Sequence, residues 1–141
     1  MTSPFEHYFA GEALYTRMVL PVCEKHGLTY MEFTVLLFLA NNPQYDTAAE
    51  IVRCRRLTKS HVSLSVRTLT ERGLLAGEYC GADRRSVHLR VLPGAEQIIE
   101  DGRAAQRRFG ETLLEGFSDA EKAKLAAFMG RIDKNIARSQ G

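Results

Sequence analysis

The chain has 141 residues, of which 45% are hydrophobic and 26% are charged, and its formal net charge is +2. This length and composition are ordinary for one soluble globular domain with its own core. No apolar run approaches the roughly 18 residues of a membrane span, and the N-terminus lacks the basic and apolar regions of a signal peptide, so we expect a cytoplasmic protein with no membrane partner.

The N-terminal segment carries apolar residues at helical spacing, and we expect a helix there that is perturbed around Pro21. Three capping boxes then mark helix starts further along the chain. In each box a hydroxyl residue stands three positions before a glutamate, so that the two side chains can satisfy each other's backbone N–H groups. These boxes are Thr29–Glu32, Thr47–Glu50 and Ser118–Glu121.

The first two boxes open helices of different character. The first helix is apolar and ends near Asn41, where Asn-Asn-Pro breaks the pattern, whereas the second is short, basic and stops near Arg55. Thr58 can cap a further helix, which ends before Gly73 in a left-handed cap position. The buried stripe of this helix is Val62, Val66 and Leu69. Its opposite face carries Lys59, Ser60, Ser63 and Arg67, with His61 beside them.

Residues 78–91, EYCGADRRSVHLRV, predict a hairpin. Apolar and polar residues alternate from Ser86 onward, which is typical of a half-buried strand. The segment from Leu74 to Tyr79 supplies a partner strand, and residues 81–83 supply the turn. Two arginines then lie at the hairpin tip, Arg84 and Arg85.

Two more helices complete the chain. A long amphipathic helix is expected from Gly94 to about Glu115, and a last one from Glu121 to about Arg138. The fold class is therefore mainly α with a small β-hairpin wing. The short basic helix and the hydroxyl-rich helix after it are typical of a helix-turn-helix, and the hairpin makes it a winged one.

Positive charge is concentrated in one segment. Between Arg53 and Arg90 there are nine basic and three acidic residues, so this segment carries +6 and the rest of the chain −4. Such a segment favours a polyanion as the partner. A helix face with hydroxyl, imidazole and ammonium donors suits a DNA major groove, and an arginine-tipped wing suits phosphates or a narrow minor groove.

The chain resembles the MarR (multiple-antibiotic-resistance regulator) family of winged helix-turn-helix transcriptional regulators. The resemblance rests on three segments in this order: GLTYMEFTVLLFLA, TAAEIVRCRRLTKSHVSLSVRTLTERGLL and ADRRSVHLRVLPGAE. It implies one MarR-type domain over residues 1–141, with the winged lobe at about 29–92. Helices at about 4–26 and 93–138 would form a dimerisation region. It also implies a homodimer that binds double-stranded DNA, typically as a repressor at a pseudo-palindromic operator.

Carried over to this sequence, the resemblance makes the helix over 58–72 the recognition helix and Arg85 the wing arginine. The chain departs from the family pattern in three places. Arg55 and Arg56 stand where the family has Leu-Gly, and Leu64 stands where a basic residue is common. Val91 and Leu92 stand where the family has the Leu-Thr that ends the wing. The predicted DNA-binding residues are Arg55, Arg56, Thr58, Lys59, Ser60, His61, Ser63, Arg67, Asp83, Arg84 and Arg85.

An effector pocket is a further expectation, at the junction of the dimerisation helices and the DNA lobe. Aromatic walls with a few hydroxyls suit a small aromatic or phenolic ligand. The alternative is that these residues simply fill the core. The candidate residues are Tyr8, Tyr15, Met18, Tyr30, Phe33, Leu37 and Phe109.

Other chemistry finds little support. Cys23 and His26 have metal-ligand spacing but no second matching pair, so we expect no metal and no cofactor. No catalytic motif is present, so we expect no enzyme. Two alternatives to the DNA-binding regulator remain open. One is a winged-helix protein-interaction module without specific DNA reading, suggested by Leu64, and the other is a redox-sensing regulator acting through Cys23.

Overall fold

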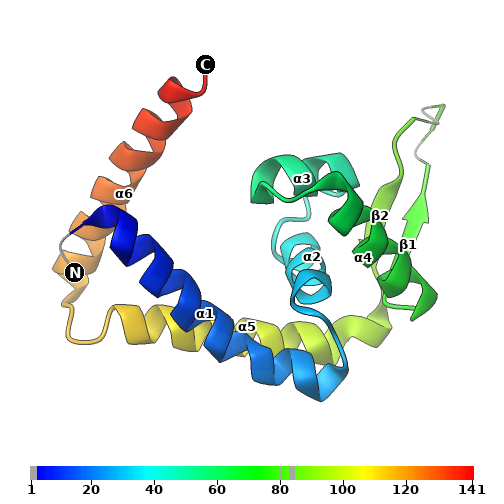
Figure 1. Cartoon of the computed structure of the whole chain (residues 1–141), viewed down its shortest axis with the longest axis horizontal. Coiled ribbons are helices and arrows are strands. Elements are labelled where there is room, and N and C mark those ends of the chain that lie inside the picture. The colour runs from blue at the N-terminus through cyan, green and yellow to red at the C-terminus, as the bar shows by residue number, and fades with distance from the viewer. Residues whose placement is uncertain (1–2, 80, 83–84) are drawn as a thin grey trace. The chain divides into compact units, whose positions relative to one another are not determined.

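The structure is a computed structural model that describes residues 3–79, 81–82 and 85–141. Over these residues it contains six α-helices, a short 3-10 turn and one antiparallel hairpin (Figure 1). The elements are α1 Pro4–His26, α2 Tyr30–Asn41, α3 Ala48–Arg55, α4 Lys59–Glu71, β1 Leu75–Glu78, β2 His88–Val91, η1 Pro93–Ala95, α5 Glu96–Leu113 and α6 Asp119–Ser139. The predicted fold class is confirmed: the chain is mainly α with a two-stranded wing.

The chain divides into two compact units, Met1–Arg108 and Phe109–Gly141. The core of the first unit is built around α2, in which every residue from Glu32 to Leu39 is buried. Thr29 caps this helix by accepting from the Glu32 N–H at 3.0 Å, while the Glu32 side chain accepts from the Thr29 N–H at 3.0 Å. A helix that is apolar on all sides must be covered on all sides, and α1, α3, α4 and β2 pack against it.

Helix α5 approaches α2 closely because of a glycine. A Cβ atom at Gly102 would lie 2.9 Å from the Phe33 ring and 3.0 Å from both methyl groups of Leu37. Any side chain there would therefore push the two helices apart. The 3-10 turn at Pro93–Ala95 precedes α5, so the long helix begins two residues later than the sequence suggested.

Helix α1 is continuous from Pro4 to His26, although we expected a perturbation at Pro21. Pro21 lies on an exposed part of the helix, where a carbonyl that loses its intrahelical donor remains open to water. The helix ends at Gly27, whose φ of 64° is left-handed and whose N–H returns to the carbonyls of Cys23 and Glu24.

The hairpin is shorter than predicted. Its register pairs Leu75 with Val91 and Glu78 with His88, so neither Tyr79 nor Ser86 belongs to a strand. Leu75 and Leu89 are buried at the base of the hairpin, whereas Val87 is 39% exposed further out. Val87 packs over Gly77, where a Cβ would lie only 2.7 Å from its Cγ1, so this position leaves no room for a side chain.

The second unit contains the end of α5 and the whole of α6. Ser118 caps α6 with a complete capping box to Glu121, as predicted. No residue of α6 is buried within the chain. Its apolar side chains are therefore exposed, among them Phe128, Met129, Ile132 and Ile136. None of the helices in the described residues is long and apolar enough to cross a membrane.

Candidate nucleic-acid interface

Helices α3 and α4 form the helix-turn-helix. Thr47 caps α3 by accepting from the Glu50 N–H at 3.2 Å, but the Glu50 carboxylate accepts from the Thr47 hydroxyl rather than from its backbone, so this capping box is only half formed. Arg56 ends α3 in a left-handed conformation, with φ 53° and ψ 44°. Thr58 then caps α4 by accepting from the His61 N–H at 3.4 Å. A turn of three residues thus sets the angle between the helices.

Arg56 is the only described residue other than glycine with a positive φ. The expected departure from the family's Leu-Gly pair therefore leaves the turn geometry intact, because an arginine adopts the conformation that a glycine would adopt without strain. Both Arg55 and Arg56 are exposed. Their charges lie at the turn, next to the start of α4.

Helix α4 separates a buried face from a donor-rich outer face. Val62 and Leu69 are fully buried and Ser65 is 5% exposed, so the inner face includes a serine that the sequence pattern did not identify. At about 100° per residue, Ser60, Leu64 and Arg67 lie in line at the centre of the outer face. His61 is exposed on one flank of that face. The remaining exposed candidates at the start of α4 are Thr58, Lys59 and Ser63.

The wing presents one described arginine at its tip. Arg85 is exposed, whereas the predicted Asp83 and Arg84 lie outside the described residues. The base of the wing is held by the segment that precedes α3: His88 Nδ1 lies 2.8 Å from Asp46 Oδ1, and the Leu89 N–H donates to the Asp46 carbonyl at 2.7 Å. His88 lies on the strand face opposite the buried Leu89, and its contact with Asp46 joins that face to the lobe.

One arginine of the basic segment points away from this surface. Arg72, which follows the last residue of α4, donates to the backbone carbonyls of Gly27 and His26 at the end of α1. Its guanidinium thus binds within the chain, and no local sequence pattern indicates this role because the partners are 45 and 46 residues away.

The candidate effector residues differ in how far they are exposed. Phe33 and Leu37 are core residues, exposed by 0% and 2%, and Tyr8 is largely exposed. Tyr15 and Tyr30 are half-buried and pack against the core. The Tyr15 hydroxyl accepts from Gln106 Nε2 at 3.0 Å, and burial raises the pKa of this phenol. The other two candidates, Met18 and Phe109, are half-buried, Phe109 in the second unit.

Cys23 lies in an environment that does not activate a thiol. Cys23 is 2% exposed, and burial raises its pKa, so the thiolate needed for oxidation is disfavoured. Cys54 is half-buried, and Cys80 lies outside the described residues. Within the described part of the chain, no three His, Cys, Asp or Glu residues are grouped so that they could hold a metal ion.

Known proteins share both the sequence pattern and the fold. A family model described as MarR family matches residues 26–86. The transcriptional regulator PA3341 is 23% identical, with a TM-score of 0.79 over 94% of each chain. Staphylococcus aureus MarR in complex with salicylate and kanamycin is 20% identical, with a TM-score of 0.76 over 95% of this chain and 90% of that one. The MepR–DNA complex from S. aureus is 16% identical, with a TM-score of 0.74 over 96% of each chain.

Proposed function

We propose that this chain, whose residues 26–86 match the MarR family model, is a winged helix-turn-helix repressor that binds a pseudo-palindromic DNA operator as a homodimer. The observation that carries this proposal is the outer face of α4, where hydroxyl, imidazole and cationic groups are exposed together beside the arginine turn. A surface of this kind offers donors to base edges and charges to phosphates within one helix width.

Within this proposal the exposed residues divide into two roles. Ser60, His61 and Ser63 approach base edges in the major groove, because they lie on the first turns of the recognition helix. Lys59 and Arg67 meet phosphates, as do the turn arginines. Arg85 enters the adjacent minor groove, whose negative potential attracts arginine.

The dimer is proposed from the apolar surface that the single chain leaves exposed. Phe5 and Phe9 in α1 are 69% and 51% exposed, and the large apolar residues of α6 are exposed by about half. Monomeric proteins rarely expose so much apolar surface. A two-fold dimer buries it and presents two copies of α4 to half-sites roughly one helical turn apart.

The proposed mechanism of repression is steric: a dimer bound to its operator would exclude RNA polymerase from the overlapping promoter DNA. Release by a small aromatic or phenolic effector is part of the proposal, since one related structure contains salicylate. The half-buried hydroxyls of Tyr15 and Tyr30 beside the core are the groups that such a ligand would meet. The buried Phe33 and Leu37 would have to move to admit it.

The test is selection of bound fragments from genomic DNA by the full-length protein. We expect enrichment of fragments that share an inverted repeat, and binding that weakens steeply with salt. His61→Ala should change the preferred bases, whereas Lys59→Ala should weaken all sequences alike. If no fragment is enriched, the DNA-reading proposal is wrong. The exposed Leu64, at 55%, would then favour a protein-docking role for α4.

A further inference from the structure

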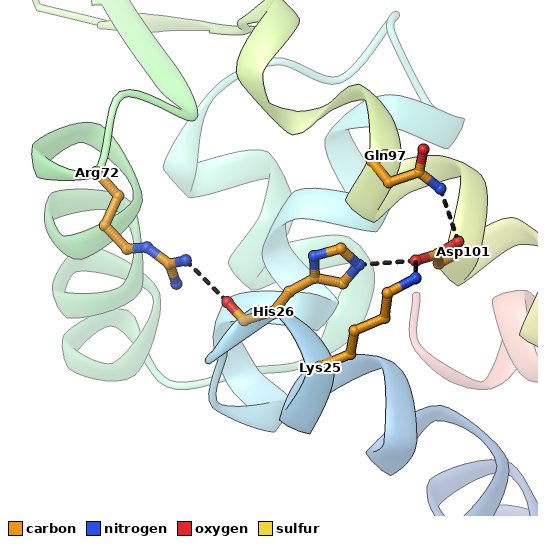
Figure 2. Close-up of polar contacts among 5 residues, drawn as sticks. All are labelled: Lys25, His26, Arg72, Gln97 and Asp101. Atoms are coloured by element: carbon orange, nitrogen blue, oxygen red, sulfur yellow. Dashed lines mark hydrogen bonds and ion pairs between the residues drawn. The ribbon is translucent and has the colours of Figure 1, made fainter.

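A series of polar contacts connects the C-terminal end of α4 to α1 and α5 (Figure 2). Arg72, the residue that follows α4, donates from Nη1 to the Gly27 carbonyl at 3.0 Å and from Nη2 to the His26 carbonyl at 2.8 Å. The two terminal nitrogens of one guanidinium thus bind two successive carbonyls. This fork, a pair of hydrogen bonds, restricts the orientation of the two helix ends as well as the distance between them, whereas the single ammonium of a lysine would restrict only the distance.

The end of α1 is a suitable partner for a cation. The last carbonyls of a helix have no intrahelical donor and carry the negative end of the helix dipole. The left-handed Gly27 turns the chain away at this point. Arg72 therefore acts as a C-terminal capping group for α1, supplied from a different helix.

The same end of α1 is fixed to α5. Asp101 Oδ2 accepts from Lys25 Nζ at 2.8 Å and lies 2.8 Å from His26 Nε2. Gln97 Nε2 donates to the other carboxylate oxygen of Asp101 at 2.9 Å. Lys25 first, and then the contacts with His26 and Gln97, hold the pKa of Asp101 well below its ordinary range, so the carboxylate stays charged at neutral pH. Figure 2 shows the sequence of contacts from α4 through α1 to α5.

We propose that Arg72 is a positioning residue that fixes the orientation of the recognition helix relative to α1 and α5 and thereby sets which half-site spacing the dimer accepts. This inference rests on the proposed DNA-binding dimer. Its physical basis is leverage: α4 has 13 residues, so it is about 20 Å long. A tilt of about 6° about its C-terminal end moves its first turn by about 2 Å, which is enough to break a hydrogen bond to a base.

Arg72 restricts the tilt of α4, whereas other contacts hold the helix in the core. The inner face of α4 is held by apolar contacts at Val62 and Leu69, which fix its depth but are less directional than a bidentate hydrogen bond. Loss of the fork would leave α4 folded and packed, but freer to rotate about those contacts. The half-site itself would still be read.

The experiment compares Arg72→Met with the wild type on operators recovered by the genomic selection. One set of duplexes carries a single half-site, and a second set has one or two base pairs inserted or removed between the half-sites. Arg90→Met is the matched control, because Arg90 is an exposed arginine that lies 3.9 Å from Glu78 in the wing and is not connected to α1. Each variant loses one positive charge.

The wild type and Arg90→Met should lose about tenfold or more in affinity for each altered spacing, in line with the usual cost of a mismatched site. Arg72→Met should bind the altered spacings within about threefold of the natural one, while its affinity for a single half-site matches that of Arg90→Met. Arg72→Lys, which can reach one carbonyl but cannot form the fork, should lie between them.

An equal spacing penalty in Arg72→Met and in the wild type would overturn the inference while leaving the proposed function intact. A wild-type protein that binds no duplex would overturn the proposed function, and the inference with it. If Arg72→Met does not fold, Asp101→Asn provides the second test, because it keeps Arg72 and releases the other end of the chain of contacts. Retained spacing discrimination in that variant would also count against the inference.

Discussion

Helices α2 and α6 begin in the same way and end up in opposite environments. Both start with a hydroxyl residue and a complete capping box, at Thr29 and Ser118. Eight successive residues of α2 are buried, whereas α6 has none. The difference lies in the apolar pattern: α2 is apolar on all sides, and α6 carries a stripe. A capping box thus specifies where a helix starts, while the apolar pattern specifies whether its own chain or a partner covers it.

The largest effect on the free energy of unfolding should come from removing a buried side chain of α2. Phe33→Ala should lower the free energy of unfolding by about 3–5 kcal/mol, because the ring is fully buried against α5. Denaturant unfolding would measure this loss. Phe128→Ala is the matched change in α6, where the ring is 54% exposed in the single chain. An equal loss in Phe128→Ala at concentrations where the protein is monomeric would contradict the contrast between the two helices.

A polar substitution in α6 should change assembly rather than folding. Ile132→Asn places an amide in the exposed stripe and should weaken dimerisation by about 2 kcal/mol, since a buried amide without a partner costs roughly that much. Light scattering across a dilution series would report the shift towards monomer. Lys134→Asn on another face of the helix is the control and should leave the series unchanged. A monomeric wild type at micromolar concentration would disprove the dimer.

The two capping boxes allow the same small change to be made in both regions. Thr29→Ala and Ser118→Ala should each cost about 1 kcal/mol at the helix start. In α2 this loss should appear in global unfolding, because the helix forms the core. In α6 it should appear as faster amide exchange over the first turn of that helix alone. If Ser118→Ala changed amide exchange equally in both units, the two units would unfold together and the expected contrast would be wrong.

Acid should weaken a carboxylate contact in each unit, with the smallest expected effect. The pKa of Asp101 is lowered first by Lys25, and that of Glu121 is lowered first by the Ser118 backbone N–H. A folded-state pKa below the unfolded one adds stability above the unfolded value, and this stability is lost as the pH falls through the folded value. Asp101→Asn should therefore be less stable than the wild type at pH 7, and the difference should disappear in strong acid. A difference that persisted there would mean that the carboxylate charge is not its cause.

Local signals predicted most of the fold. The start of α4 at Thr58, the left-handed Gly73 after it and the end of α2 at Asn41 all follow from residues within one or two turns. The continuous α1 was mispredicted because the effect of Pro21 depends on whether its surroundings are open to water. Such surroundings are not encoded in the neighbouring residues.

Two features of the lobe that the sequence missed depend on distant partners. His88 pairs with Asp46, which is 42 residues away, and Arg72 pairs with carbonyls at the end of α1. Neither the alternation of the strand nor the count of charges identifies these contacts, because neither method considers distant partners. The exposed residues of α4 were easier to predict, since helical periodicity alone separates them from Val62 and Leu69.

Under the proposed function, the left-handed Arg56 between α3 and α4 opposes thermal stability to operator affinity at a single position. Holding a residue with a Cβ at φ 53° costs about 1 kcal/mol relative to glycine. Arg56→Gly should therefore raise the melting temperature, and under the proposed function it should weaken DNA binding by removing a charge at the turn. A directed-evolution screen for heat tolerance would enrich this substitution, and a screen for tight repression would eliminate it.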